Sequence, residues 1–171
     1  FRGFHMASQD AEQALEVTLS HCRDLQEMDL GINPKWQKEL DALVEAIAAA
    51  PCFHTLTRLD LSKNVEFRGD VGCFGRLKRL RQLSLGWAKK LTGDIAGLSG
   101  LEDLQELHLQ GTQVSGDVRG LDPLGHLQKL DLGWTEVSGD VQGLRRLVHL
   151  QKLWLHDTQV SGDVEGLSPL V

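Results

Sequence analysis

The sequence of 171 residues contains no tyrosine, only two asparagines, and no apolar run that approaches the length of a membrane-spanning helix. The missing run predicts a protein that does not bind or cross a membrane through a spanning helix. Neither Asn33 nor Asn64 begins an Asn-X-Ser/Thr site, so the sequence offers no position for N-glycosylation. These absences favour a soluble intracellular protein.

Cysteine is also scarce, with three residues at Cys22, Cys52 and Cys73 and no Cys-X-X-Cys spacing. That spacing is typical of zinc sites and redox motifs. Because each cysteine stands beside leucines, we expect three free, buried thiols in a reducing compartment. The predicted localisation is therefore cytoplasmic, although a signal peptide that had been removed would leave no trace in this sequence.

The formal net charge is −6, which argues against a general nucleic-acid-binding surface. The one basic run, RLKRLRQ at 76–82, alternates with leucines and is interpreted as a solvated rim. An apolar fraction of 41% is enough for one elongated core. The first eight residues, FRGFHMAS, look like an expression-vector remnant. We therefore predict a remnant at 1–8 and a single domain at 9–171.

A short motif repeats along the chain. Gly-Asp followed by Val or Ile occurs at 69–71, 93–95, 116–118, 139–141 and 162–164, at steps of 24, 23, 23 and 23 residues. A fixed period of this length is typical of a solenoid, in which each turn buries its apolar side chains against the next.

Leucines recur in one frame between these motifs, as LxxLxL. The six frames are Leu25/Met28/Leu30, Leu56/Leu59/Leu61, Leu80/Leu83/Leu85, Leu104/Leu107/Leu109, Leu127/Leu130/Leu132 and Leu150/Leu153/Leu155. The alternation within LxL places leucines inward and the residues between them outward on a parallel sheet. The glycine-leucine pairs and a column at 67, 91, 114, 137 and 160 are expected to complete the core.

Over residues 25–171 this pattern resembles the leucine-rich repeat, and LTGDI at 91–95 resembles the plant-type repeat with its short second strand. Two features depart from that family: no proline follows the Val or Ile, and Thr112, Thr135 and Thr158 stand where asparagine is usual. The resemblance implies an α/β solenoid forming a curved arc, with one parallel sheet on its concave face.

Helices are predicted only near the N-terminus. One spans about Gln9–His21, with an apolar face that includes Leu15 and Leu19. A second begins with Asn33 as N-cap and Pro34 in its first turn, and ends before Pro51. Helical repeats at 9–55, similar to those of ribonuclease-inhibitor-like proteins, therefore precede short repeats at 56–171. The first helix is expected to cover the open end of the core.

The repeated aspartates Asp70, Asp94, Asp117, Asp140 and Asp163 are predicted to form a ladder of like charges on adjacent turns. One interpretation is a cation site, because calcium prefers several carboxylate oxygens. The favoured interpretation is that each carboxylate accepts a hydrogen bond from the backbone of its own turn, without metal.

The outward positions of the predicted strands vary between repeats and carry the candidate binding residues. These are Trp87, His108, Gln110, Lys129, Asp131, Trp134, Lys152, Trp154 and His156. Exposed tryptophans are enriched where proteins bind partners. Incidental exposure is the alternative, because positions on the convex side vary equally.

No catalytic residue, metal ligand or cofactor is predicted. A His108/Asp131 pair lacks a nucleophile nearby, and His126 with His149 beside Asp103 lacks the usual third metal ligand. The sequence therefore predicts a non-catalytic module that binds a protein or peptide on the concave face.

Two alternative functions remain. In the first, the chain is an assembly element or a fragment that associates through its uncapped last turn, including as an end-to-end homodimer. In the second, it is a regulatory arm of a larger enzyme.

Overall fold

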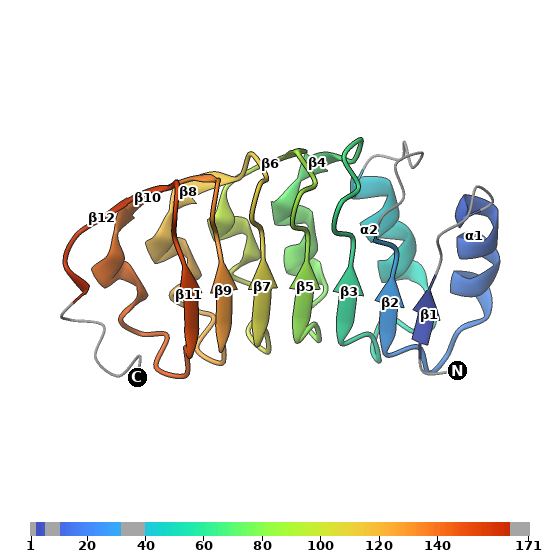
Figure 1. Cartoon of the computed structure of the whole chain (residues 1–171). Helices are drawn as coiled ribbons and strands as arrows, with labels where there is room; N and C mark the ends of the chain where they lie inside the picture. The colour runs from blue at the N-terminus through green and yellow to red at the C-terminus, as the bar shows by residue number, and fades with distance from the viewer. Residues whose placement is uncertain (1–2, 6–10, 32–39, 165–171) are drawn as a thin grey trace.

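The computed structural model describes residues 3–5, 11–31 and 40–164. The chain winds as a stack of turns, with a row of parallel strands along one side and helices or short 3-10 turns along the other (Figure 1). The predicted leucine-rich-repeat solenoid is therefore confirmed.

Seven strands form one parallel sheet in the order of the sequence. They are β1 (Gly3–His5), β2 (Glu27–Asp29), β3 (Arg58–Asp60), β5 (Gln82–Ser84), β7 (Glu106–His108), β9 (Lys129–Asp131) and β11 (Lys152–Trp154). The six strands predicted from the LxxLxL frames are all present. Strand β1 pairs with β2 and lies within the segment interpreted as a vector remnant, where the sequence predicted no element.

A second set of short strands lies away from the seven-stranded sheet, next to the 3-10 turns (Figure 1); this side of the solenoid is called the 3-10 side. Strands β4 (Arg68–Asp70) and β6 (Lys90–Thr92) pair with each other, and β10 (Glu136–Asp140) lies between β8 (Ser115–Asp117) and β12 (Gln159–Ser161). Strands β4, β8 and β10 each contain a Gly-Asp pair, and β6 and β12 end directly before one, so the repeats form the short second strands that the plant-type resemblance implies. Each of the first four repeats leads into a 3-10 turn: η1 (Val71–Arg76), η2 (Ile95–Leu98), η3 (Val118–Leu121) or η4 (Val141–Leu144).

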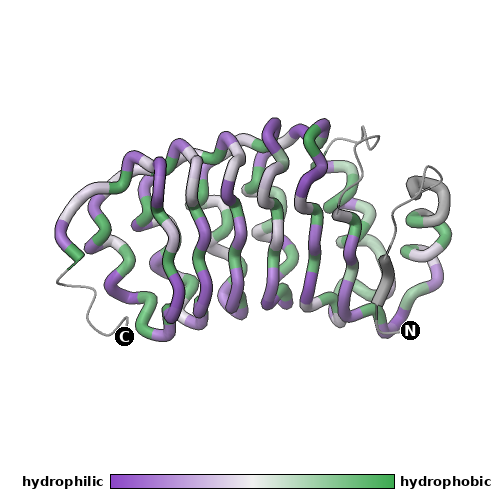
Figure 2. The backbone as a smooth tube through the Cα atoms, in the orientation of Figure 1, coloured by the Kyte–Doolittle hydropathy of each residue, from purple (hydrophilic) through white to green (hydrophobic). Residues whose placement is uncertain are grey.

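The core is the continuous leucine stack that the period requires. The first five LxxLxL frames, Phe67, Leu91, Val114 and Val137 are all buried. Hydrophilic and hydrophobic residues alternate along the turns in Figure 2, because one side of each strand faces the core and the other faces solvent. The final turn is more open: Leu153, Leu155 and Val160 are only partly buried. Part of the proposed terminal contact surface, at 165–171, lies outside the described residues.

The family's asparagine position is filled in a way the sequence did not predict. Asn64 donates to the carbonyl of Leu61 in its own turn and to that of Leu30 in the preceding turn. At this position Thr112 and Thr135 are buried, and each hydroxyl donates only to the carbonyl three residues earlier, at 2.6 Å. Each threonine thus satisfies the carbonyl of its own turn, and within the described residues its hydroxyl forms no hydrogen bond to the neighbouring turn.

The carboxylates of the aspartate ladder form hydrogen bonds with the backbone of their own turns. Asp70, Asp94, Asp117 and Asp140 each accept a hydrogen bond from the backbone N–H two residues later, at 2.7–2.8 Å, and begin the 3-10 turns as N-caps. This confirms the predicted backbone bonds. Each carboxylate also lies over the glycine of the next repeat: a Cβ on Gly139 would be 2.6 Å from Oδ1 of Asp117. The Gly-Asp pair is repeated because each aspartate occupies the space that a side chain at the next glycine would need.

Two α-helices lie in the N-terminal third, α1 (Ala11–His21) and α2 (Leu40–Ala49). No α-helix occurs later in the described chain, as predicted. Leu15 and Leu19 of α1 are buried, and α1 lies at the end of the stack, the position expected of a cover (Figure 1). The predicted N-cap at Asn33 lies outside the described residues. Neither helix is long and apolar enough to cross a membrane, within the part of the chain that is described.

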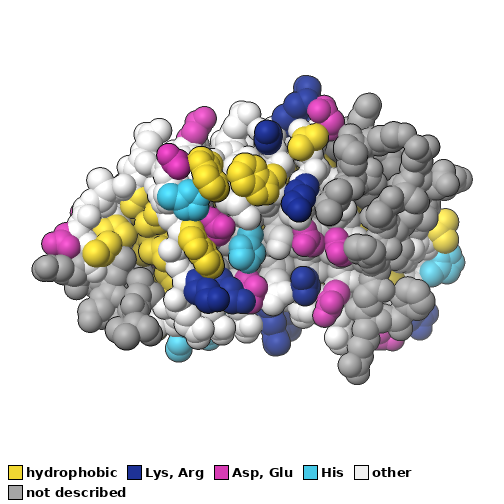
Figure 3. Space-filling model, viewed as in Figure 1, with side chains coloured by type: hydrophobic (Ala, Val, Ile, Leu, Met, Phe, Trp, Pro, Cys, Tyr) yellow, Lys and Arg dark blue, Asp and Glu magenta, His cyan; other side chains and the backbone are white. Residues whose placement is uncertain are grey.

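The outward side chains of β2, β3, β5, β7, β9 and β11 lie on the face of the sheet seen in Figure 3, called here the outer face. It is the side of the sheet that the family resemblance expects to be concave.

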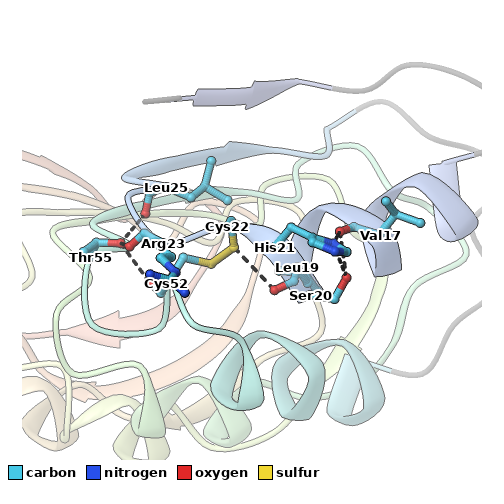
Figure 4. The surroundings of a disulfide bond; sticks show 9 residues. All are labelled: Val17, Leu19, Ser20, His21, Cys22, Arg23, Leu25, Cys52 and Thr55. Carbon is cyan, nitrogen blue, oxygen red and sulfur yellow. Dashed lines mark hydrogen bonds between the residues drawn. A yellow bond between two sulfur atoms is a disulfide. The ribbon is translucent and has the colours of Figure 1, made fainter.

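The prediction of three free cysteines is wrong, because Cys22 and Cys52 form a disulfide (Figure 4). Cys22 follows α1 and Cys52 follows α2, and their Cα atoms are 5.5 Å apart, within the range that a disulfide spans. The Thr55 hydroxyl donates to the carbonyl of Leu25 at 2.8 Å beside the bridge. The pairing joins residues 30 positions apart, so it depends on how the two helices pack.

Cys73 is the one free cysteine. Burial raises the pKa of its thiol to about 12, and the nearby Asp41 carboxylate adds to the effect. The Cys73 thiol is therefore uncharged at neutral pH and a poor nucleophile.

Candidate functional site

The candidate site lies on the part of the outer face formed by β5, β7, β9 and β11. It consists of the outward residues of these strands and of the two residues after the last leucine of each LxxLxL frame, at 86–87, 110–111, 133–134 and 156–157. Side chains in register on neighbouring strands form rows across the sheet. One row reads Ser84, His108, Asp131, Trp154, and the next reads Gln82, Glu106, Lys129, Lys152. The structure thus brings all nine predicted binding residues to one end of one face.

Hydrophobic side chains gather over the ends of β7, β9 and β11 in Figure 3, with histidine and acidic side chains around them. The large hydrophobic residues are the three predicted tryptophans, with exposed fractions of 38% for Trp87, 49% for Trp134 and 38% for Trp154. Their predicted exposure is confirmed. Contiguous apolar surface on a soluble protein often marks a place where a partner docks.

Three aromatic rings form a continuous row. The centroids of the Trp87 and Trp134 rings are 5.4 Å apart, and those of Trp134 and His156 are 4.1 Å apart at an interplanar angle of 85°. Both distances are short enough for favourable aromatic contact, and the second pair is edge to face. The row therefore holds its rings in a fixed arrangement at the surface.

The rings contact each other because glycines lie under them. A Cβ on Gly111 would be 2.5 Å from Cε3 of Trp87, and a Cβ on Gly133 would be 2.5 Å from Cε1 of His156. Trp87 thus crosses the repeat that separates it from Trp134. Gly86 is covered in the same way by the Gln110 side chain, whose Oε1 is buried without a hydrogen-bond partner among the described residues.

Two of the tryptophans have a backbone conformation that is unfavourable for their residue type. The φ angles are 65° at Trp87 and 55° at Trp134, and the equivalent positions in other repeats are Lys63, Gly111 and Asp157, also with positive φ. At four of these five positions, all except Asp157, the N–H bonds to a carbonyl of the next turn, as from Trp87 to Gln110 at 2.7 Å. Glycine fits there without strain, whereas an aromatic residue costs about 1–2 kcal/mol. Strain of this kind is concentrated at functional sites.

An ion pair lies at the opposite edge of the same face. Lys129 Nζ donates to Glu106 Oε1 at 2.7 Å, and His108 Nε2 is 3.8 Å from the other oxygen of Glu106. Burial alone would raise the pKa of Glu106, but the hydrogen bond and positive charge of Lys129, with a smaller effect of His108, hold that pKa below its ordinary value. Glu106 is therefore ionised, and Lys129 compensates its charge.

The histidines considered for catalysis or metal binding lie in two separate places. His108 and Asp131 are in register on neighbouring strands of the open outer face. His126 and His149 stack with ring centroids 6.1 Å apart on neighbouring turns. Within the described residues no group of three or more His, Cys, Asp or Glu side chains is arranged to hold a metal ion. His126 and His149 are exposed, whereas His108 and Asp131 are half-buried side chains on the open outer face.

Basic side chains lie on the 3-10 side. Arg76 pairs with Glu45 of α2, and Arg79 lies 3.9 Å from Asp103, so the run at 76–82 is a partly paired, solvated rim as predicted. A shallow recess farther along this side is lined by Arg119, Asp122, Gln142, Gly143, Arg145 and Arg146. The sequence did not single out this recess because its arginines come from two different repeats.

No protein-family model and no curated protein matches the chain. Among solved structures, the chain is similar to internalin C2 of Listeria monocytogenes, with 28% identity and a TM-score of 0.66 over 90% of this chain and 61% of the internalin. It is also similar to a TDR receptor, with 25% identity and a TM-score of 0.62 over 80% of this chain and 23% of the receptor.

A third similar structure is the Arabidopsis receptor kinase HAESA, solved in complex with the peptide hormone IDA and the co-receptor SERK1. It shares the fold at 24% identity and a TM-score of 0.67, over 85% of this chain and 24% of the receptor. The chain thus spans less than two thirds of each of these three proteins. The LxxLxL frames, the parallel sheet in sequence order and these structural relatives together show that the chain has the leucine-rich-repeat fold.

Proposed function

We propose that the protein is a non-catalytic binding module that holds a protein or peptide on the outer face of its sheet, around Trp87, Trp134, Trp154 and His156. The observation that carries the proposal is the aromatic row. Two tryptophans occupy a backbone position that favours glycine, remain exposed, and contact each other across a glycine. A folding role gives no reason to keep tryptophan there, whereas binding does.

The structural relatives are compatible with this proposal. HAESA, which has the same fold, was solved with a peptide hormone bound. Fold alone does not assign function, because another protein of similar fold is a plant ice-binding protein. The proposal therefore depends on the side chains of this face.

The test is cross-linking and capture of partners from the source cells with wild type, Trp134→Ala and Val148→Ala. Val148 is the matched control, because it is an exposed hydrophobic residue, at 58%, outside the outer face. We expect Trp134→Ala to remove a captured protein that wild type and Val148→Ala retain. Equal capture by all three proteins would contradict the proposed function.

We further propose an oxidising environment for the mature protein, in place of the cytoplasmic localisation expected from free thiols. The Cys22–Cys52 disulfide supports this change, since disulfides persist mainly in oxidising compartments. Thiol labelling of the protein in its source cells, before and after reduction, tests it. Three labelled cysteines without reduction would restore the cytoplasmic expectation.

A further inference from the structure

At the end of the outer face that carries Trp134 and Trp154, the acidic side chains of Asp131 and Asp157 have no basic partner among the described residues. Lys129 neutralises Glu106, but no Lys or Arg of the described chain forms an ion pair with Asp131 or Asp157. Asp131 Oδ1 accepts the N–H of Gly133 at 3.1 Å, which orients the carboxylate without neutralising it. Lys152 of β11 forms no ion pair among the described residues, so Asp131, Asp157 and Lys152 together leave one net negative charge at this end of the face, on a protein whose net charge is −6.

Both carboxylates lie beside the aromatic side chains. Asp131 is in register with Trp154 on the neighbouring strand. Asp157 occupies, one turn later, the position of Trp134 in the repeat, and the two turns are joined by the hydrogen bond from Trp134 N–H to the carbonyl of His156 at 3.0 Å. Asp131 thus neighbours Trp154, and Asp157 neighbours the contacting pair of Trp134 and His156; these side chains are together called the cluster below.

Carboxylates and exposed indoles together favour one kind of ligand. A cation over an indole ring is attracted by the negative ring face. A guanidinium is planar, so it stacks on the ring and still directs several N–H donors to carboxylates at its edge, whereas an ammonium is compact and more strongly hydrated. An arginine side chain uses both features of this cluster.

We propose, on the basis of the binding function proposed above, that the cluster is a recognition site for an arginine side chain of a cationic peptide segment. The guanidinium stacks on the indoles of Trp134 and Trp154 and donates hydrogen bonds to Asp131 and Asp157. An acidic segment is excluded by the two carboxylates. The occupant is therefore chosen by charge as well as by apolar contact.

The direct test uses the full chain with ¹⁵N-labelled tryptophan, so that the indole N–H signals report on the face. The probes are acetyl-Gly-Arg-Gly-amide and the same peptide with lysine or with citrulline, which is a neutral analogue of arginine. We expect saturable shifts of the Trp134 and Trp154 signals with the arginine peptide, weaker binding of the lysine peptide, and no binding of the citrulline peptide. Equal binding of the arginine and citrulline peptides would overturn the proposal.

The matched variant is Asp131→Asn/Asp157→Asn. Asparagine keeps an oxygen that accepts the Gly133 N–H and tolerates the positive φ of 53° at 157, so the fold is retained. We expect about tenfold weaker binding of the arginine peptide, because two exposed charge contacts are lost. The control Asp103→Asn/Asp122→Asn removes the same charge from turns after η2 and η3 and should bind as wild type does. An Asp131→Asn/Asp157→Asn variant that binds as tightly as wild type contradicts the proposal.

The failure of this proposal is distinguishable from failure of the binding function itself. A partner that is captured in a Trp134-dependent manner, but is retained by Asp131→Asn/Asp157→Asn and not displaced by the arginine peptide, would leave the binding face intact and refute arginine recognition. Displacement by the arginine peptide and not by the citrulline peptide would support both.

Discussion

The indole of Trp87 lies over the Cα of Gly111, one turn away, at a distance that no side chain at 111 would allow. Gly111 also has a φ of 70°. The glycine therefore serves both the tight turn of the solenoid and the contact between Trp87 and Trp134. This pair connects the regular repeat, which fixes the turn, to the irregular side chains, which form the candidate site.

Gly111→Ala is expected to destabilise the fold by about 1–2 kcal/mol, because alanine is strained at positive φ and its Cβ overlaps the Trp87 ring. The indole must move, so its fluorescence should change as well. Chemical denaturation followed by tryptophan fluorescence measures both effects. Gly125→Ala is the control, since nothing lies within 4 Å of a Cβ there, and its midpoint should stay near that of wild type. An unchanged midpoint for Gly111→Ala would contradict the assigned strain.

Trp134→Gly and Trp134→Ala separate backbone strain from ring contacts. Both remove the contacts with Trp87 and His156, but only glycine relieves the strain at a φ of 55°. We expect the glycine variant to be about 1 kcal/mol more stable than the alanine variant. Both variants should lose partner binding equally. The urea concentrations at which the two variants are half unfolded compare their stabilities. A glycine variant that is less stable than the alanine variant would show that position 134 is unstrained.

The periodic features of the fold could be predicted from the sequence because every turn must bury its leucines against the next turn in the same way. The LxxLxL frames predicted all six strands, and the Gly-Asp repeats predicted the turns with their backbone-capped carboxylates. Trp154 is placed on the outer face by the alternation with Leu153 and Leu155. Trp87 and Trp134 lie after their strands, two residues beyond an inward leucine, so alternation alone does not place them; they occupy the positive-φ position of the turn.

Features that depend on contacts between unlike repeats could not be predicted in this way. The Trp87–Trp134 contact needs a glycine in the intervening repeat, and both tryptophans have a positive φ at the position whose N–H bonds to the next turn. The Cys22–Cys52 bridge needs the packing of two helices that lie outside the regular period. Strand β1 was missed because its residues were attributed to a remnant.

The disulfide should hold the first helix against the stack. In the chain-entropy model, a crosslink between residues 30 apart stabilises the fold by about 3–4 kcal/mol. Cys22→Ser/Cys52→Ser should therefore lower the free energy of unfolding by an amount of this order, and reduction of the wild type should do the same. Differential scanning calorimetry with and without reductant measures it. Cys73→Ser is the control, and it should leave the response to reductant unchanged. A wild type that is insensitive to reductant would contradict a stabilising bridge.

Asp117 tests the role of the aspartate ladder. Its carboxylate accepts the N–H of Arg119 at 2.8 Å as the N-cap of η3. Asp117→Ala should cost about 1 kcal/mol, and Asp117→Asn less, because asparagine is also a good cap. Calorimetric titration with calcium should give no saturable heat with wild type. A saturable heat that Asp117→Asn abolishes would instead favour the cation interpretation of the ladder.

The Glu106–Lys129 pair predicts the sign of a pH effect. The pKa of Glu106 is lower in the folded protein than in the unfolded chain. Its ionised form therefore stabilises the fold above the unfolded-state pKa, which is about 4.3 for glutamate, and this contribution is lost as the pH falls through the folded-state value. Because both side chains are partly exposed, the contribution should be at most about 1 kcal/mol.

Glu106→Gln should accordingly be less stable than wild type at pH 7, and the difference should shrink steadily below pH 4 as the wild-type carboxylate is protonated. Urea denaturation of both proteins at pH 7, 4 and 3 gives the three differences. Glu102→Gln is the matched control, because Glu102 is an exposed glutamate on a turn for which no ion pair is seen, and its difference from wild type should be small at every pH. A Glu106→Gln difference that stays constant or grows on acidification would mean that Lys129 does not hold the carboxylate in its ionised form, and the partner-free charge on the outer face would then have to include Glu106.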